Sequence, residues 1–146
     1  MNIGCGKKIH AEYINVDIRD LPGVDVRADA RNLPFPSNCF EYILASDIIE
    51  HFPAQEAPKI IKEWKRVLAP GGVIEFKLPN LKTIAQAYID KRIGASKTSW
   101  LLYGGQDYDE NFHYAGYDRE SFRKLVGLNE FEYKEDEFNM IIKFRV

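Results

Sequence analysis

The sequence predicts an α/β fold built on an open, mostly parallel β-sheet, and two observations support this prediction. Short apolar runs rich in β-branched residues alternate along the chain with segments whose apolar residues recur every three or four positions. Hydrophobic residues make up 45% and charged residues 29% of the 146 positions, as in globular proteins with a buried core. We therefore expect one α/β domain over residues 1–146.

Seven short runs have the composition of strands. They are Met1–Ile3, Tyr13–Val16, Val24–Ala28, Phe40–Ala45, Val73–Leu78, Glu130–Lys134 and Met140–Val146. Only a short polar link separates the last two runs, so we expect them to pair as an antiparallel hairpin.

Three segments have the periodicity of helices. The clearest is the apolar stripe that runs from Ala57 to Leu68 and stops before Pro70. A second helix is expected from Leu81 to about Gly94, and a third between an N-cap at Asp118 and a stop at Gly127. The intervening segment 96–118 has no steady period, so we expect a long surface loop with room for one helical turn. Loops of this length are more often functional than accidental.

Composition excludes several classes of protein and site. A formal net charge of -2 gives no broad electrostatic case for a nucleic-acid or membrane partner. The two cysteines, Cys5 and Cys39, are too few for a disulfide framework and lack zinc-site spacing, so we expect buried fillers and no metal. No apolar run approaches the roughly 18 residues of a membrane span, and no signal pattern begins the chain. A cytoplasmic location is expected.

The opening stretch, MNIGCGKK, raises the question of what its glycine turn holds. It lacks the Lys-Ser/Thr ending of a phosphate-binding loop, and Ile9 stands where a dinucleotide fingerprint needs a third glycine, which disfavours an oxidoreductase. What remains is Gly-x-Gly after one strand and Asp17 at the end of the next, where a carboxylate can accept hydrogen bonds from a ribose diol. The alternatives are a plain tight turn and a helix-capping acid. Lys7 and Lys8 either neutralise a ligand carboxylate or are solvated.

Four blocks in order resemble the successive motifs of class I S-adenosylmethionine-dependent methyltransferases. They are NIGCG, NVD, ADARNLPFPSNCFEYILASDIIEHF and EWKRVLAPGGVIEFKLPN, between residue 2 and about residue 80. The resemblance implies an enzyme with S-adenosylmethionine as cofactor. It also implies a three-layer, seven-strand sheet of order 3-2-1-4-5-7-6 in which the last strand is antiparallel.

The resemblance further implies a set of cofactor contacts. Asp17 would accept hydrogen bonds from the ribose hydroxyls and Asp29 from the adenine amino group. The other contacts would lie around the adenine ring and the methionine end of the cofactor, at Ala30 and Leu33 and at Gly4, Gly6, Ala45 and Ser46.

The sequence departs from the family between the first two strands. Only Lys7–Glu12 separates Gly6 from the second strand, so the helix expected there is reduced or missing, as in a compact member with a shortened N-terminal region. One layer of the sandwich should be thin and the site open. A large substrate, weakened cofactor affinity or a homodimer would each be consistent with that opening.

Two histidines are candidates for the base that methyl transfer to a hydroxyl or amine requires. His51 follows the fourth strand, and His113 lies on the long loop among aromatic residues. The structural alternatives are a helix-start residue for His51 and a packing role for His113. The sequence thus predicts methyl transfer to a small-molecule or sugar-like acceptor. The alternative is a non-catalytic, methyltransferase-like binding or interaction subunit.

Overall fold

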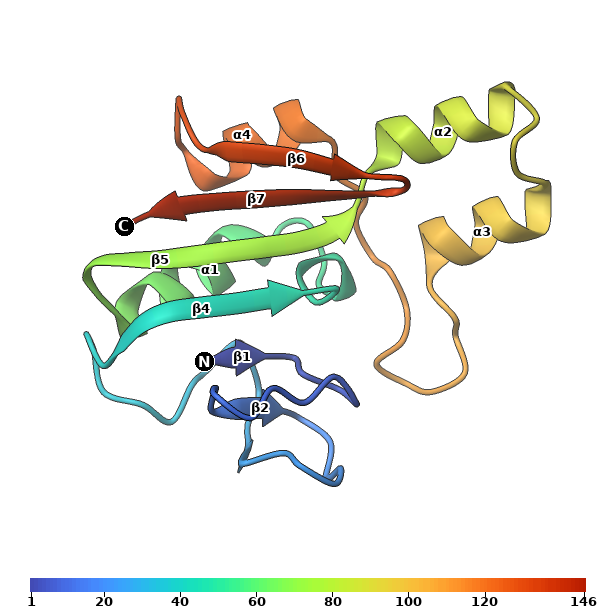
Figure 1. The fold of residues 1–146 in the computed structure, drawn as a ribbon. Helices are drawn as coiled ribbons and strands as arrows, with labels where there is room; N and C mark the ends of the chain where they lie inside the picture. Colours follow the sequence, from blue (N-terminus) through green and yellow to red (C-terminus); the bar gives the residue numbers. More distant parts are fainter.

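The computed structural model describes residues 1–146 and contains one seven-stranded sheet of order β3-β2-β1-β4-β5-β7-β6 (Figure 1). Neighbouring strands from β3 to β5 are parallel, and β7 is antiparallel to both β5 and β6. The predicted strand order and hairpin are therefore confirmed. The strands are β1 (Asn2–Ile3), β2 (Asn15–Asp17), β3 (Val26–Arg27), β4 (Phe40–Ser46), β5 (Leu68–Pro79), β6 (Glu132–Asp136) and β7 (Asn139–Arg145).

The three predicted helices form, two of them close to their predicted limits and the second ending at Ile89 rather than near Gly94. They are α1 (Ala57–Val67), α2 (Leu81–Ile89) and α4 (Arg119–Val126). The caps of α4 are those that the sequence predicts. The Asp118 side chain accepts a hydrogen bond from the Ser121 N–H, and Gly127 ends the helix at a φ of 70°.

The segment 96–118 contains more helix than the sequence predicts. It carries most of α3 (Ala95–Tyr103). Outside this segment, a short 3-10 helix, η1 (Ile49–His51), follows β4. Helix α3 buries only Leu101, so its sequence shows almost no apolar stripe by which it could be recognised. The prediction of a loop was wrong for residues 95–103, whereas residues 104–117 form an extended loop.

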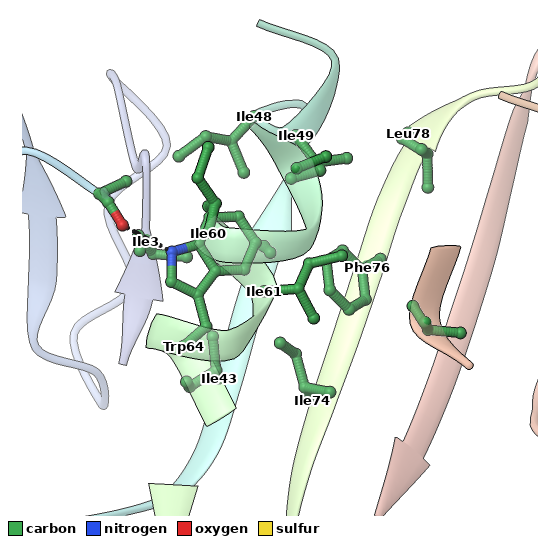
Figure 2. Close-up of a cluster of buried hydrophobic side chains, with 14 of the residues drawn as sticks. Ile3, Ile43, Ile48, Ile49, Ile60, Ile61, Trp64, Ile74, Phe76 and Leu78 are labelled. Carbon is green, nitrogen blue, oxygen red and sulfur yellow. Dashed lines mark hydrogen bonds between the residues drawn. The ribbon is translucent and has the colours of Figure 1, made fainter. Parts of the chain in front are cut away.

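The core lies between the sheet and the helices α1 and α4, which lie behind it in Figure 1. Alternate residues of the central strands face these helices, as the two-residue period of a strand requires. Figure 2 shows the result around Trp64, whose indole stacks on Phe76 with ring centroids 5.8 Å apart. The same buried cluster includes residues of β1, β4, β5 and α1, among them Ile3, Ile43, Ile60, Ile61, Ile74 and Leu78.

The opposite face of the sheet carries polar side chains, and its layer lacks the helix expected between β1 and β2. Tyr42 Oη donates a hydrogen bond to Glu75 Oε2 at 2.6 Å, and Lys143 Nζ lies 3.7 Å from the same carboxylate oxygen. Residues 4–14, between β1 and β2, form turns and no helix. This confirms the prediction that the crossover helix is reduced or missing. None of the helices combines the length and apolar character needed to cross a lipid bilayer.

Candidate functional site

A cavity of about 400 Å³ opens at the carboxyl ends of β1, β2 and β3. Its remaining walls are residues after β4 and part of the loop 104–117, which passes beside these strand ends in Figure 1. Open α/β sheets bind ligands where the strand order reverses, which here is between β1 and β4. The cavity volume lies within the range of small-molecule sites.

The glycines of the opening turn have different positions relative to this cavity. Gly4 lines it, whereas Gly6 does not. Both have positive φ, 63° and 52°, a conformation that glycine adopts without strain. A Cβ on Gly4 would lie 2.3 Å from Ile48 Cδ1, so close packing also requires glycine there. The Gly6 N–H donates a hydrogen bond to Asp17 Oδ2 at 2.7 Å, which ties the turn to the end of β2.

Asp17 lines the cavity and is only 6% exposed. Its Oδ1 accepts hydrogen bonds from the backbone N–H of Arg19 at 2.9 Å and from Arg19 Nε at 3.1 Å. Burial opposes ionisation, but hydrogen bonds from the Arg19 side chain and from the Arg19 and Gly6 backbones outweigh it and lower the pKa of Asp17. Asp17 is therefore an ionised acceptor at neutral pH.

Arg19 is a site residue that the sequence analysis missed. Its guanidinium lies 4.3 Å from the ring centroid of Tyr108, and both side chains line the cavity. The cation–π contact joins the end of β2 to the loop 104–117. Nothing in the local sequence pairs these two positions, because they meet only in the folded chain.

Asp29 and Ala30 both line the cavity, after β3. Two hydrogen bonds from the Arg31 side chain, Nε and Nη2 to Asp29 Oδ2 at 3.0 and 2.7 Å, lower the pKa of Asp29. The Ala30 carbonyl accepts a hydrogen bond from Trp64 Nε1 at 2.8 Å, drawn as the dashed line at the indole in Figure 2. The Ala30 N–H donates no hydrogen bond within the chain. Leu33 lies in the core and away from the cavity.

Ala45 and Ser46 end β4 without lining the cavity. The wall begins one residue later, at Asp47, whose carboxylate receives a hydrogen bond from Lys8 Nζ at 2.7 Å. Lys8 is thus paired with Asp47 across the strand ends.

The two candidate histidines are brought together by the fold. The ring centroids of His51, on η1, and His113, on the loop 104–117, are 4.7 Å apart at an interplanar angle of 87°. Burial lowers the pKa of both rings, and for His51 the charge of His113 lowers it further, so both are neutral at pH 7. His51 lines the cavity, whereas His113 does not.

Glu50 is the second residue that the sequence analysis did not select. It is 2% exposed, and neither of its carboxylate oxygens has a hydrogen-bond partner. Burial raises the pKa of Glu50 to about 8. A carboxylate oxygen of Glu50 and one ring nitrogen of each histidine lie within 4.8 Å of one another. The sequence offered only the adjacency of Glu50 and His51 as a signal.

Solved structures with a similar fold include proteins described as methyltransferases. The PH0226 protein of Pyrococcus horikoshii matches 89% of this chain and 69% of its own at a TM-score of 0.61 and 19% identity. A methyltransferase of Thermotoga maritima, described as S-adenosylmethionine-dependent, matches 84% of this chain and 64% of its own (TM-score 0.59, 17% identity). The 1,6-didemethyltoxoflavin-N1-methyltransferase of Burkholderia thailandensis, solved with S-adenosylhomocysteine, matches 89% and 59% (TM-score 0.57, 10% identity).

Sequence relatives lead to the same family. The ubiquinone/menaquinone biosynthesis C-methyltransferase of Yersinia enterocolitica is 39% identical over 66 residues, which are 43% of this chain and 26% of that enzyme. The chain thus matches about a quarter of the length of this curated relative. The methyltransferase-domain family model matches residues 1–76, more than half of the chain. This chain therefore belongs to the class I S-adenosylmethionine-dependent methyltransferase family.

Proposed function

We propose that this chain transfers a methyl group from S-adenosylmethionine to a small polar acceptor of the sugar type. The observation that carries the proposal is the single cavity in which the fold assembles Gly4, Asp17, Asp29 and Ala30. These residues come from the ends of three different strands. The family membership supports the cofactor and the reaction class.

The residues of the cavity fit the cofactor. Its volume of about 400 Å³ is that of a small-molecule site. It offers the buried carboxylate of Asp17, the half-exposed carboxylate of Asp29 and the Ala30 N–H, which has no partner. A ribose diol donates hydrogen bonds and adenine both donates and accepts them, so these groups are complementary. Asp17 would hold the ribose, and Asp29 and the Ala30 N–H would hold the adenine edge. The cofactor supplies an electrophilic methyl group on a positively charged sulfur.

Alignment of the acceptor is the main task left to the protein, since methyl transfer is an in-line displacement. Tyr108, Tyr114, Asp109 and Glu110 of the loop 104–117 form one wall of the cavity. Aromatic faces and carboxylates together suit a ligand that presents both C–H faces and hydroxyl groups, as a sugar does. The family model ends at residue 76, before this loop. The match to a quinone-pathway enzyme covers only 26% of that enzyme, so it carries no weight for the acceptor.

A second candidate function rests on the ion pairs of the cavity. Arg19 already bonds Asp17, and Arg31 already bonds Asp29 through both carboxylate oxygens. A chain in which these pairs are permanent would keep the fold and bind no adenosyl group, as expected of an interaction subunit. The enzyme is the favoured function because Asp17 Oδ2 accepts a hydrogen bond only from the Gly6 N–H and can accept another from a ligand.

Calorimetric titration with S-adenosylmethionine and with S-adenosylhomocysteine separates the two functions. Binding of both, weakened by about 1–3 kcal/mol in Asp17→Ala, is expected because the variant leaves ribose hydroxyls unpaired. Formation of S-adenosylhomocysteine in the presence of a panel of monosaccharides and nucleotide sugars then tests the acceptor class. No binding at millimolar cofactor would support the interaction subunit instead.

A further inference from the structure

Three side chains with metal-binding chemistry meet at the wall of the cavity. Glu50 and His51 belong to η1, and His113 comes from the loop 104–117. One ligand atom from each lies within 4.8 Å of the others. His51 faces the cavity, so a ligand bound at this cluster would be next to the acceptor position.

Both imidazoles are held in a tautomer that metal ligands use. His51 Nδ1 lies 3.1 Å from the Phe112 carbonyl oxygen, and His113 Nδ1 lies 3.2 Å from that of Leu101. A carbonyl oxygen can only accept, so each Nδ1 carries the proton and each Nε2 presents a lone pair. Metal-ligating histidines are commonly fixed in this way, through a backbone carbonyl on the other nitrogen.

The Glu50 side chain can be ionised at this position only beside a positively charged or proton-donating partner. It is buried, and an ionised carboxylate without a partner is strongly disfavoured in a protein interior. The nearest cation that acts on it, Lys8, is bonded to Asp47 at 2.7 Å. The one other buried side-chain atom without a partner is the Tyr117 hydroxyl, whose pKa is raised by burial and by the charge of Glu50.

We propose that Glu50, His51 and His113 bind one divalent transition-metal ion. Two imidazoles and one carboxylate are a ligand set used for zinc and for non-haem iron, whereas magnesium and calcium prefer oxygen ligands alone. Ligand atoms that lie about 2.1 Å from one tetrahedral zinc ion are about 3.4 Å apart. Pairs separated by up to 4.8 Å must therefore close by up to about 1.4 Å when the ion binds.

The metal site adds a means of activating the acceptor to the proposed function, and this chemical role rests on that function. A three-ligand ion keeps coordination positions open, and the open side here is the cavity that His51 lines. Such an ion would supply Lewis-acid chemistry to an acceptor hydroxyl. The sequence predicted no metal because that prediction considered cysteine and histidine spacing, and these ligands are a neighbouring pair and a distant loop residue.

Zinc titration of the tag-free 146-residue chain, after removal of metal with a chelator, tests the proposal. We expect one Zn²⁺ per chain, a rise in melting temperature with added Zn²⁺, and binding roughly 100-fold weaker or more in His113→Ala. Glu50→Gln should also lose the zinc-dependent rise while melting at or above the temperature of the metal-free wild type. The neutral amide has the shape of the protonated acid and never becomes a buried charge, so this variant keeps the test valid if His113→Ala misfolds.

Matched controls identify the ligands. His10→Ala and Cys39→Ser, which alter residues outside the cluster, should bind Zn²⁺ as the wild type does. Substitution by Co²⁺ should give an absorption spectrum without a thiolate-to-cobalt band. Absence of zinc binding, binding that survives Glu50→Gln and His113→Ala, or a thiolate band would each overturn the site. Titration of the same preparation with S-adenosylmethionine tests the proposed function separately.

Discussion

The half of the sheet formed by β4, β5, β7 and β6 and the half formed by β1–β3 are held together in different ways. In the first, long strands lie against α1 and α4 around an apolar core. In the second, the strands are only two or three residues long, and no helix lies between β1 and β2. The Asn15 side chain contributes bonds there instead. It accepts hydrogen bonds from Asn2 Nδ2 and the His10 N–H and donates to the carbonyls of His10 and Tyr13.

The difference separates the origin of stability from the position of the chemistry. Apolar burial in the first half provides the main free energy of folding. The short strands of the second half place polar groups at an open cavity, where their side chains remain available to a ligand. Trp64 links the two, because it lies in the core of the first half and donates to Ala30 at the cavity.

The largest expected effect on stability is that of Trp64→Ala. The side chain is fully buried, and truncations of this kind lower the free energy of unfolding by about 3–5 kcal/mol. Urea denaturation measures the loss. Trp100→Ala is the matched control, since Trp100 is 55% exposed and its removal should change stability by no more than about 0.5 kcal/mol. Equal losses of stability in the two variants would show that the main core is not the one around Trp64.

His113→Ala tests the loop that reaches from one half to the other. Methyl transfer should fall by about 10²–10⁴-fold, as expected when the group that activates the acceptor is lost. Affinity for S-adenosylmethionine should stay within a factor of two or so, because His113 does not line the cavity. His10→Ala is the control for activity. A parallel fall in cofactor affinity would mean that the loop serves the cofactor rather than the acceptor.

Asn15→Ala tests the polar network of the thin half. Removing the side chain leaves one amide hydrogen of Asn2 and backbone groups of the turn unpaired, which should lower the free energy of unfolding by about 1–3 kcal/mol. Amide hydrogen exchange should increase in β1 and β2 and remain unchanged in β5 and β7. Uniform acceleration across the sheet would contradict the view that the two halves are supported separately.

Asp29→Ala should affect the ligand and leave the fold unchanged. The carboxylate is half-exposed and bonded mainly to Arg31, so its loss should change stability by about 0.5 kcal/mol or less. Affinity for adenosyl ligands should fall by a measurable factor in calorimetry. Circular dichroism monitors the fold, and unchanged affinity would exclude Asp29 from the adenine site.

The smallest effect concerns acid stability. The pKa of Asp17 is lower in the folded chain than the value of about 3.9 in an unfolded chain, so its bonds stabilise the protein above that pH. The contribution is lost as the pH falls through the folded pKa. Asp17→Asn should therefore flatten the stability profile between about pH 5 and pH 2, whereas Asn at the exposed Asp20 should not. Identical profiles would indicate that Arg19 does not hold the Asp17 carboxylate in solution.

The sequence by itself determined the elements whose signals are local. The apolar stripe of α1, the caps of α4 at Asp118 and Gly127, and the polar link of the last hairpin are readable because near neighbours in the chain create them. The absence of a helix between β1 and β2 followed from length alone. Helix α3 was not predicted from the sequence because it buries a single residue and so has no apolar stripe.

Only the tertiary structure decided which of the candidate site residues meet. It brought Gly4, Asp17, Asp29 and Ala30 to one cavity and left Gly6, Leu33, Ala45 and Ser46 outside its walls. It also put His51 against His113, Arg19 against Tyr108, and Glu50 in the interior without a partner. Distances across a fold and the burial of a charge depend on how distant segments pack, and no local pattern of residues encodes them.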